Sequence, residues 1–462
     1  MKLFKAKKGV IIPGKKDDTA KLATVSYTSP EYVYIPLSVK GNDFEVLVKP
    51  GDKVKLGQKI AVRKTGVPLV KHATVSGEVV GTERKNHRTG LPYVCIKIKN
   101  DFQDETLTFT PIDFEKATKN ELIDRIEEAG IVGLGGAGFP THAKYRGAEN
   151  IDTVILNGAE CEPYLTSDYR VMIEDTFHVV NGLRILMKTA QAEKGIIVLK
   201  QGYKEAYEAL VKECAQYDNL QVFLVPNQYP AGWERQVVYR TLKRRYEKYP
   251  YECGVIVNNI STAVAVSEAI TEGKPLVERV ITVGGEGVIK PGNYRVRIGT
   301  LASELIKQAG GIAKDLGDVR IIAGGPMMGV AQKNDDFVIT RALTGILVLL
   351  GEHKYEVPHK KPVGDVLLDV LHFSEHDPRF FIRDEQPCVR CGSCVFNCPA
   401  GLQPTLLRDA ALAKDEVRLG KLDVMECIDC GTCAYVCPSH ILINDAIRRG
   451  KTYYQVKVKN TK

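Results

Sequence analysis

The sequence lacks any apolar run long enough to cross a membrane. The longest, GILVLL at 345–350, falls well short of the roughly 18 to 20 apolar residues that a transmembrane helix requires. The opening residues, MKLFKAKKG, are charged and are not followed by the apolar core and small-residue cleavage site of a secretory signal. We therefore expect a chain that is either soluble or attached to a membrane through partner proteins.

The net charge is also small, and tryptophan is rare. The 64 Lys and Arg residues barely outnumber the 56 Asp and Glu residues, and Trp233 is the single tryptophan among 462 residues. So small an excess of positive charge permits an acidic partner or an anionic membrane surface without requiring one, and we expect no nucleic-acid partner. Lysines gather near both ends, where we interpret them as solvated terminal charge. Apolar content is ordinary for a globular protein, and the length predicts two to four domains.

Disulfide bonds are not expected, although the sequence has 12 cysteines. Without an export signal we expect a reducing compartment, where clustered cysteines indicate metal ligation. Four cysteines are scattered along the chain, whereas eight lie between residues 388 and 437. The placement of the cysteines therefore points to a metal centre near the C-terminal end of the sequence.

Two segments, CVRCGSCVFNCP (388–399) and CIDCGTCAYVCP (427–438), share the pattern C-x2-C-x2-C-x3-C-P. This is the bacterial ferredoxin run, in which three close thiolates bind one [4Fe-4S] cluster and the fourth binds the other cluster. Structural zinc is the weaker alternative, because it favours two ligand pairs separated by a longer spacer. The pattern predicts one cluster on Cys388, Cys391, Cys394 and Cys437, and the other on Cys427, Cys430, Cys433 and Cys398. Two clusters this close would form a short electron path.

The hydrophobic pattern divides the chain into five segments. Short strands broken by turns predict an all-β sandwich of the biotinyl/lipoyl type, but no lysine is placed to carry a swinging cofactor. Alternating strands and helices then predict an α/β layer with a largely parallel sheet, and strands around one helix predict a small β-grasp module. The predicted units are an N-terminal barrel-sandwich (1–112), an α/β domain (113–275), the β-grasp module (276–350), a polar linker (351–380) and a helical two-cluster ferredoxin-like domain (381–462).

The α/β domain contains the most detailed pattern. Thr118 and Glu121 form a capping-box pattern before Leu122, Ile123 and Ile126, which recur at helical spacing, so a helix is predicted over 121–129. The remaining predicted elements are buried strands at 153–157, 196–200, 222–225 and 255–259, and helices over 168–192, 203–215 and 232–246.

GLGGAGFPTHAK, residues 133–144, places four glycines within six positions. A Rossmann fingerprint must follow a strand and open a helix, but these glycines follow the predicted helix, so that interpretation fails. A merely flexible turn also fits poorly, because four glycines cost too much chain entropy to be idle. Close approach of the backbone to a phosphate, with Lys144 nearby as a point charge, explains the composition better.

The glycine loop resembles the flavin-binding loop of the NADH-oxidising 51-kDa subunit of respiratory complex I. NGAECEP (157–163), VNNISTA (257–263) and, more loosely, YPAGWERQ (229–236) share this resemblance. With the N-terminal sandwich, PGNYRVRIG, GGPMMG and the twin cysteine motifs, nearly the whole chain resembles the RnfC family. That family is the peripheral NADH/flavin subunit of the ion-translocating ferredoxin:NAD oxidoreductase (Rnf) complex. The chain departs from the family at residues 10–13, which lack a histidine, and at Trp233, which replaces a small or acidic residue.

The resemblance implies a role for each matched residue. Phe139 would stack on the adenine of NADH, and Glu162 and Glu234 would contact the dinucleotide. Residues implied to hold the FMN phosphate and ribityl chain are Gly133, Gly135, Gly136, Gly138 and Lys144, and those implied to line the flavin are Asn157, Glu160, Asn258, Asn259 and Thr262. No catalytic acid–base pair is expected, because the cofactor itself performs hydride transfer.

We therefore expect NAD(H), FMN and two [4Fe-4S] clusters to act in series at the cytoplasmic face of the cell membrane. The implied partners are membrane and peripheral subunits of an Rnf-type complex, with ferredoxin as an indirect partner. Two alternatives stay open. A soluble cobalamin reductase-like enzyme shares the flavin loop and the cluster sites but lacks the N-terminal sandwich, and a non-catalytic electron relay would keep the clusters without a functional flavin.

Overall fold

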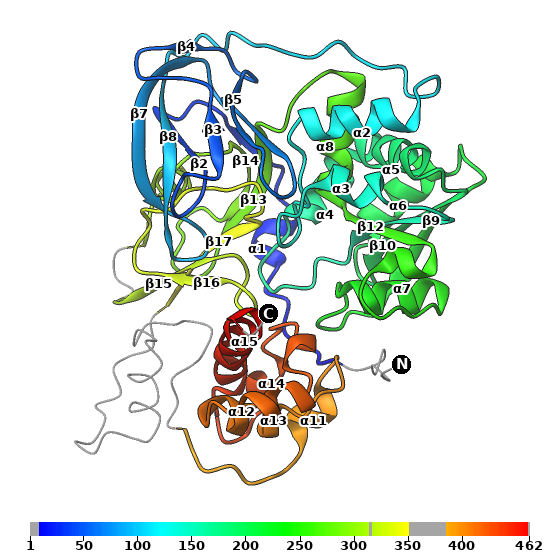
Figure 1. Ribbon diagram of the computed structural model, residues 1–462, viewed down its shortest axis with the longest axis vertical. Helices are drawn as coiled ribbons and strands as arrows, with labels where there is room; N and C mark the ends of the chain where they lie inside the picture. The colour runs from blue at the N-terminus through cyan, green and yellow to red at the C-terminus, as the bar shows by residue number, and fades with distance from the viewer. Residues whose placement is uncertain (1–8, 314–316, 351–384, 461–462) are drawn as a thin grey trace.

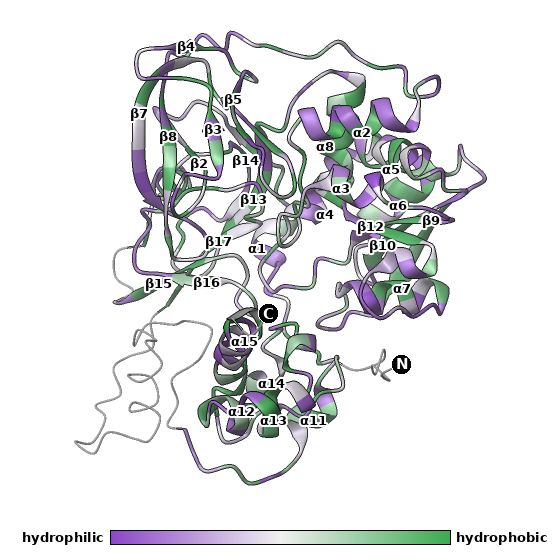
Figure 2. Ribbon diagram, viewed as in Figure 1, coloured by the Kyte–Doolittle hydropathy of each residue, from purple (hydrophilic) through white to green (hydrophobic). Residues whose placement is uncertain are grey.

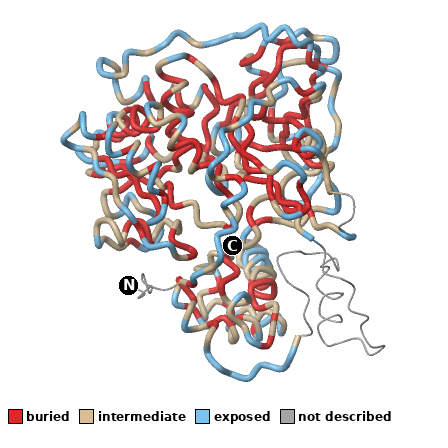
Figure 3. Tube along the Cα trace, turned by 180° about the vertical axis from the view of Figure 1, so that it is seen from behind, coloured by how far each residue is buried: buried red, intermediate tan, exposed pale blue. Residues whose placement is uncertain are grey.

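The computed structural model describes residues 9–313, 317–350 and 385–460. A β-rich half lies beside an α/β half, and a small helical unit lies at one end of the molecule (Figure 1). One hydrophobic cluster joins Ile60 of the β-rich half to Leu122 of the α/β half, and Figure 3 shows buried residues on both sides of this contact. The two halves therefore share an interior. The predicted linker, 351–380, lies outside the described residues.

The N-terminal unit is a sandwich of two antiparallel sheets, as predicted. Val33, Ile60 and Ile98 are fully buried between the sheets, because alternate residues of each strand face inward. One sheet has the order β2 (Tyr32–Pro36), β8 (Pro92–Asn100), β7 (Gly77–Asn86), β4 (Lys53–Val54), and the other has the order β3 (Phe44–Val46), β5 (Lys59–Arg63), β6 (Leu69–His72).

The α/β unit contains a four-stranded parallel sheet, which confirms the predicted layer. The strands lie in the order β11 (Leu220–Val225), β10 (Lys194–Lys200), β9 (Thr153–Gly158), β12 (Val255–Asn259). They are predominantly apolar (Figure 2) because helices cover both faces of the sheet. The helices are α2 (Lys119–Glu128), α3 (Thr141–Arg146), α4 (Ser167–Glu174), α5 (Thr176–Ala190), α6 (Lys204–Cys214), α7 (Glu234–Leu242) and α8 (Ile260–Thr271).

Two helix predictions in this unit need correction. The single helix predicted over 168–192 is two helices, α4 and α5, separated at Asp175. The Asp175 carboxylate accepts a 2.7 Å hydrogen bond from Arg295 of the β-grasp module, a tertiary contact that helical periodicity cannot register. The helix predicted over 232–246 is shorter, because Lys243 adopts a left-handed conformation after α7.

The β-grasp module is built on a six-stranded sheet that includes a strand from the start of the chain. The order is β1 (Val25–Tyr27), β14 (Gly292–Arg297), β13 (Glu278–Gly284), β17 (Gly345–Leu350), β15 (Val319–Ala323), β16 (Val330–Gln332), with α9 (Ala302–Gln308) packed against it. β1 lies parallel to β14, and α1 (Asp17–Ala20) contacts the same sheet. The segment before the sandwich therefore belongs structurally to a module encoded about 270 residues later.

The C-terminal unit is a small helical domain with cysteines in its core. Cys394 and Cys398 pack with Leu407 and Ile447 in one hydrophobic cluster. The elements are α11 (Ser393–Asn397), α12 (Pro404–Leu412), α13 (Glu416–Lys421), the 3-10 helix η2 (Val424–Glu426), α14 (Thr432–Tyr435) and α15 (Ile443–Asn460). Among the helices in the described ranges, none is long and apolar enough to cross a membrane.

Candidate functional site

The glycine loop projects from a buried neck between α2 and α3. Val132 and Pro140 form a bridge across the neck, where the Gly133 amide donates to the Phe139 carbonyl at 2.8 Å. Leu134 is 2% exposed and anchors the base of the loop, whereas Gly135 and Gly136 at the tip are exposed. The loop thus presents bare backbone to solvent from a fixed base, which is the arrangement that a phosphate group can approach.

The glycines of this loop differ in what a side chain would meet. A Cβ at Gly135 would lie 2.5 Å from the Asn259 amide nitrogen, and Gly138 has a φ of +73°, which disfavours other residues. A Cβ at Gly136 would meet no protein atom within 4 Å. Packing therefore requires glycine at position 135, and backbone geometry requires it at position 138. Gly136, in contrast, borders open space.

The carboxyl ends of β9 and β12 bring two of the predicted asparagines together. Asn157 and Asn259 are register neighbours; the Asn157 amide donates to the Gly232 carbonyl at 2.8 Å, and the Asn259 amide donates to Asp168 at 2.7 Å. Asn258 is 3% exposed and donates to the Tyr145 hydroxyl, on the opposite face of the sheet. Asn157 and Asn259 thus lie beside the glycine loop, whereas Asn258 supports the strand from behind.

Thr262 and Lys144 both lie beneath the loop. The Thr262 hydroxyl, fully buried, accepts a hydrogen bond from the Leu134 amide at 3.0 Å. The Lys144 ammonium donates to the Val257 carbonyl at 2.8 Å, and burial lowers the pKa of Lys144, partly opposed by the charge of Glu234. Thr262 therefore fixes the loop to α8, and Lys144 places a cation against the middle of β12.

A pair of buried acids lies behind Asn259. The Glu160 carboxylate accepts the Asp168 amide at 3.0 Å, and Asp168 in turn accepts hydrogen bonds from Asn259 and Ser261. Burial, with a further contribution from Glu160, raises the pKa of Asp168 to about 6. These carboxyl groups orient Asn259, so Asp168 is a supporting residue that the sequence prediction missed, although it lies in the motif NGAECEPYLTSDYR.

Lys16 was also missed, because the N-terminal lysines were interpreted as solvated charge. Its side chain is 11% exposed, and its ammonium lies 3.6 Å from Glu160 and donates to the Leu165 carbonyl. For Lys16 that interpretation was wrong. A short basic segment carries no signal that one of its lysines pairs with an acid about 140 residues later, so only the tertiary structure identifies this contact.

The predicted dinucleotide contacts lie in different surroundings. Phe139 is 48% exposed at the end of the loop. Glu234 starts α7 and accepts the Tyr246 hydroxyl at 3.0 Å, and Trp233 before it lies 6.0 Å from the Arg235 guanidinium. Glu162 accepts the Met327 amide at 2.9 Å, which joins the NGAECEP loop to the β-grasp module. Burial raises the pKa of Glu162 to about 7.

We predict that Glu162→Gln stabilises the protein in a pH-dependent way. The folded state raises the pKa of this carboxyl, so the wild type loses stability as pH rises from about 4.5 to about 7 and the variant does not. At pH 8 the variant should gain about 3 kcal/mol, and at pH 4.5 almost nothing. Thermal unfolding midpoints at both pH values measure this. The exposed Glu149→Gln control should gain nothing, and equal gains for Glu162→Gln at both pH values would contradict the prediction.

Four cysteines from the two motifs line one cavity in the C-terminal unit. Its walls are otherwise mainly apolar, and the cysteines are Cys398, Cys427, Cys430 and Cys433. Burial and then the neighbouring thiols, Cys398 among them, raise the pKa of Cys433 well above its ordinary value. The fourth cysteine of the first motif thus lies with the first three of the second, the combination predicted for one cluster.

The other predicted ligand set is less enclosed. Cys388 and Cys391 are exposed, whereas Cys394 is buried. Burial raises the pKa of Cys394, with Cys437 a weaker contributor, so these two thiols are neighbours. In the described part of the chain, no three His, Cys, Asp or Glu side chains lie close enough together to bind a metal ion as they stand. Four soft thiols within apolar walls are suitable ligands for an iron–sulfur cluster, so the cavity lined by Cys398, Cys427, Cys430 and Cys433 fits such a cluster.

Tyr229 connects this cluster cavity to the NGAECEP loop. Its hydroxyl donates to the Cys430 carbonyl at 2.7 Å and lies 3.4 Å from Glu162. Cys161 and Met327 pack around the same contact, and the Arg235–Glu426 ion pair, at 2.6 Å, lies on the same side of the C-terminal unit. The two candidate sites are therefore held in one packed body.

Four known domain families match the chain in sequence order. They are the RnfC barrel sandwich hybrid domain (4–103), the Nuo51 FMN-binding domain (126–268), the SLBB domain (280–331) and the 4Fe-4S dicluster domain (380–449). The SLBB match covers most of the module predicted to be a β-grasp. The order agrees with the predicted fold class, and the two central cofactor predictions, FMN and iron–sulfur clusters, are supported by the matching domains.

Whole-chain relatives have the same organisation. The chain is 35% identical over 409 residues to the C-subunit of the Na(+)-translocating ferredoxin:NAD(+) oxidoreductase complex of Acetobacterium woodii, covering 86% of this chain and 85% of that protein. It is 36% identical over 385 residues to the C-subunit of the proton-translocating complex of Clostridium ljungdahlii, covering 82% and 78%. An NAD+-reducing [NiFe]-hydrogenase structure is more distant, at 17% identity and a TM-score of 0.48, covering 76% of this chain and 64% of that one. With its four domains in this order and these relatives, the chain belongs to the RnfC family.

Proposed function

We propose that this chain exchanges hydride between NAD(H) and FMN, and single electrons with two [4Fe-4S] clusters. It would do so as a peripheral subunit, at the cytoplasmic face of the membrane, of an ion-translocating ferredoxin:NAD+ oxidoreductase. Tyr229 carries this proposal, because it bridges Glu162, in the loop after β9, and Cys430, in the cluster cavity. A flavin site and a cluster site coupled through one side chain fit electron transfer between them better than two independent functions.

The predicted residues that lie beside the glycine loop have a place in this proposal. FMN supplies the hydride and electron chemistry when bound. Its phosphate and ribityl chain would lie on the exposed backbone of Gly135 and Gly136, with Lys144 as the nearby cation. Asn157 and Asn259 would orient the ring, and Glu160 and Asp168 keep Asn259 in place by hydrogen bonds. Exposed Phe139 is available to stack on the adenine of NAD(H).

The cluster ligands in this proposal are the two crossed sets. Cys427, Cys430, Cys433 and Cys398 would hold the cluster that lies against Tyr229, and Cys388, Cys391, Cys394 and Cys437 the more exposed one. The enclosed cluster would receive electrons from the flavin side, and the exposed cluster would face a partner subunit of the complex. This order follows from the burial of the two sets and from the contact between Tyr229 and Cys430.

An anaerobic visible spectrum of the cluster- and FMN-loaded protein tests this function. Stoichiometric NADH should bleach both the flavin band and the broad iron–sulfur band. A protein that retains its clusters but no FMN would instead be a non-catalytic relay. If FMN is bound and NADH bleaches neither band, the dinucleotide assignment is wrong, and Trp233 beside Glu234 becomes the first residue to replace.

We predict that Tyr229→Phe slows cluster reduction without removing either cofactor. The change deletes the hydrogen bond to the Cys430 carbonyl, and one such bond is worth about 1 kcal/mol, or about fivefold in the equilibrium between docked and undocked units. Stopped-flow reduction by NADH should show normal flavin bleaching followed by slower cluster bleaching. Tyr207→Phe is the control, since Tyr207 makes no hydroxyl hydrogen bond in the described part of the chain. Equal cluster rates in the two variants would contradict the bridging role.

A further inference from the structure

A basic pocket lies on the flank of the glycine loop opposite Asn259. It is formed where the sandwich, the glycine loop and the β-grasp module meet, and its volume is about 130 Å³. Ala137 and Gly138 of the loop form one wall, and a Cβ at Gly138 would point to Ala342, another lining residue, at 3.4 Å. At Gly135 the corresponding direction points to Asn259. The loop therefore separates the pocket from the candidate flavin side.

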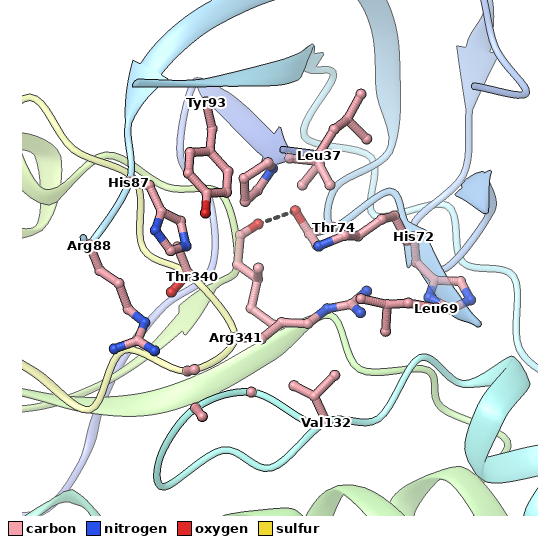
Figure 4. Close-up of a pocket in the computed structure, with 17 residues that line it drawn as sticks. Leu37, Leu69, His72, Thr74, His87, Arg88, Tyr93, Val132, Thr340 and Arg341 are labelled. Atoms are coloured by element: carbon pink, nitrogen blue, oxygen red, sulfur yellow. Dashed lines mark hydrogen bonds between the residues drawn. The ribbon is translucent and has the colours of Figure 1, made fainter. Parts of the chain in front are cut away.

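The lining of the pocket carries one sign of charge. Its basic members are Lys71, His72, His87, Arg88 and Arg341, and no Asp or Glu lines it. Figure 4 shows His87 and Arg88 at one end of the pocket, next to Tyr93 and Thr340, and His72 and the Arg341 guanidinium toward the other end, with Thr74 between them. The pocket is partly open, and its basic residues range from half-buried Lys71 and Arg88 to buried Arg341. Cations gathered where water is partly excluded are normally paired with an anion.

The contacts of these cations are neutral. The Arg341 guanidinium donates to the Val70 and Gly130 carbonyls at 2.8 and 2.9 Å. Arg88 donates to the Gly136 carbonyl at 3.2 Å. The Lys71 ammonium faces the Phe44 ring, 5.4 Å from its centroid, and makes no hydrogen bond or ion pair within the described residues. Positive charge in this pocket is therefore held by carbonyl dipoles and a ring, and no carboxylate of the described residues lines the pocket to balance it.

Mutual repulsion among these groups supports the same conclusion. Burial and the charges of Arg341 and Arg63 lower the pKa of Lys71 well below its ordinary value. Burial, with Arg88 and Lys71, lowers the pKa of His87 to about 4. The negative charge of a bound anion would raise both pKa values again, and the pocket has room for several water molecules and hence for a phosphate group. Lysine and arginine are the residues that bind phosphate most strongly.

We propose that the basic pocket binds a phosphate-bearing anion, with Lys71 and Arg88 as its principal ligands. The ligand would touch Ala137 and Gly138, so its binding would be coupled to the conformation of the glycine loop. The coupling rests on the proposed function, since it matters for catalysis only if the loop holds FMN. The binding itself does not depend on that function.

Titration calorimetry of the full chain, loaded with FMN and clusters, tests the proposal with three probes in phosphate-free buffer: inorganic phosphate, pyrophosphate and AMP. One saturable site is expected, and Lys71→Gln should weaken it about tenfold or more, because a charge-assisted hydrogen bond is lost. The matched control is Lys99→Gln, an exposed lysine of the same sandwich, which should bind as the wild type does. If Lys71→Gln does not fold, Arg88→Gln makes the same test at the other end of the pocket.

Three results would overturn the proposal. The first is no saturable binding, and the second is unchanged binding in a folded Lys71→Gln or Arg88→Gln variant. The third is release of FMN by the probe, which would locate the anion in the flavin site. Binding of the inorganic anions alone would identify a free oxyanion, and tighter binding of AMP would identify a nucleotide phosphate. If the protein proves not to bind FMN, the proposed function fails, but calorimetry of the flavin-free chain still decides whether the pocket takes an anion.

Discussion

Replacing Cys398 with alanine should remove the cluster held by the second cysteine motif and spare the cluster held by the first. Cys398 belongs to the first motif by sequence, but it lines the cavity of Cys427, Cys430 and Cys433. With three thiolates left for one cluster, iron content should fall from about eight to about four per chain. Iron analysis and EPR of the reduced protein measure the effect, since the coupling between two neighbouring clusters would disappear with one of them.

The chain provides a matched control in Cys253, which lies in the α/β unit. Cys253→Ala removes a thiol that belongs to neither cysteine motif, so it should leave iron content and the EPR spectrum unchanged. Cys437→Ala should give the reciprocal result and remove the cluster of the first motif. Loss of the first-motif cluster in Cys398→Ala would show that each motif binds its own cluster, and the crossed assignment would then be wrong.

A valine at Gly136 should weaken FMN binding about a hundredfold, enough to lose the flavin on purification, while leaving the fold and the clusters intact. A Cβ at this position meets no protein atom within 4 Å, so the folded chain can accommodate it, whereas a phosphate approaching the backbone cannot. Loss of two charge-assisted hydrogen bonds costs about 3 kcal/mol, which weakens binding about a hundredfold. Flavin released by denaturing the purified variant, measured by fluorescence, quantifies the loss.

Gly147→Val is the control for that substitution. Gly147 also has open space around its Cβ position and an ordinary negative φ, but it lies after α3, away from the loop tip. The control should retain FMN, and both variants should retain their iron. Normal flavin content in Gly136→Val would mean that the open side of the loop is not the face that receives the phosphate.

Local sequence patterns were sufficient for the elements that later position the site. Thr118 and Glu121 do form a reciprocal capping box, and the apolar spacing of Leu122, Ile123 and Ile126 does mark the buried face of α2. The β-branched runs ending in Asn157 and Asn259 are parallel neighbours. These features depend on contacts between residues close in sequence, or on strand burial, both of which leave a periodic signature.

Features that depend on distant partners could not be predicted. Asp175, at the helix break, pairs with Arg295, Lys16 pairs with Glu160, and Tyr229 donates a hydrogen bond to the Cys430 carbonyl. Each of these residues is ordinary in its local context, so neither propensity nor periodicity distinguishes it. The basic pocket is the extreme case, because its cations come from segments as far apart as Lys71 and Arg341.

The N-terminal segment that contributes Val10, Lys16 and β1 has a consequence for how the chain folds. Val10 and Tyr229 exchange two backbone hydrogen bonds at 2.8 Å, Lys16 pairs with Glu160, and Val25 is in register with Tyr294. None of these partners exists when the ribosome releases the segment. The segment must therefore wait, partly unpaired, until about 270 further residues have been made before β1 can join its sheet, so its native contacts form much later than its synthesis.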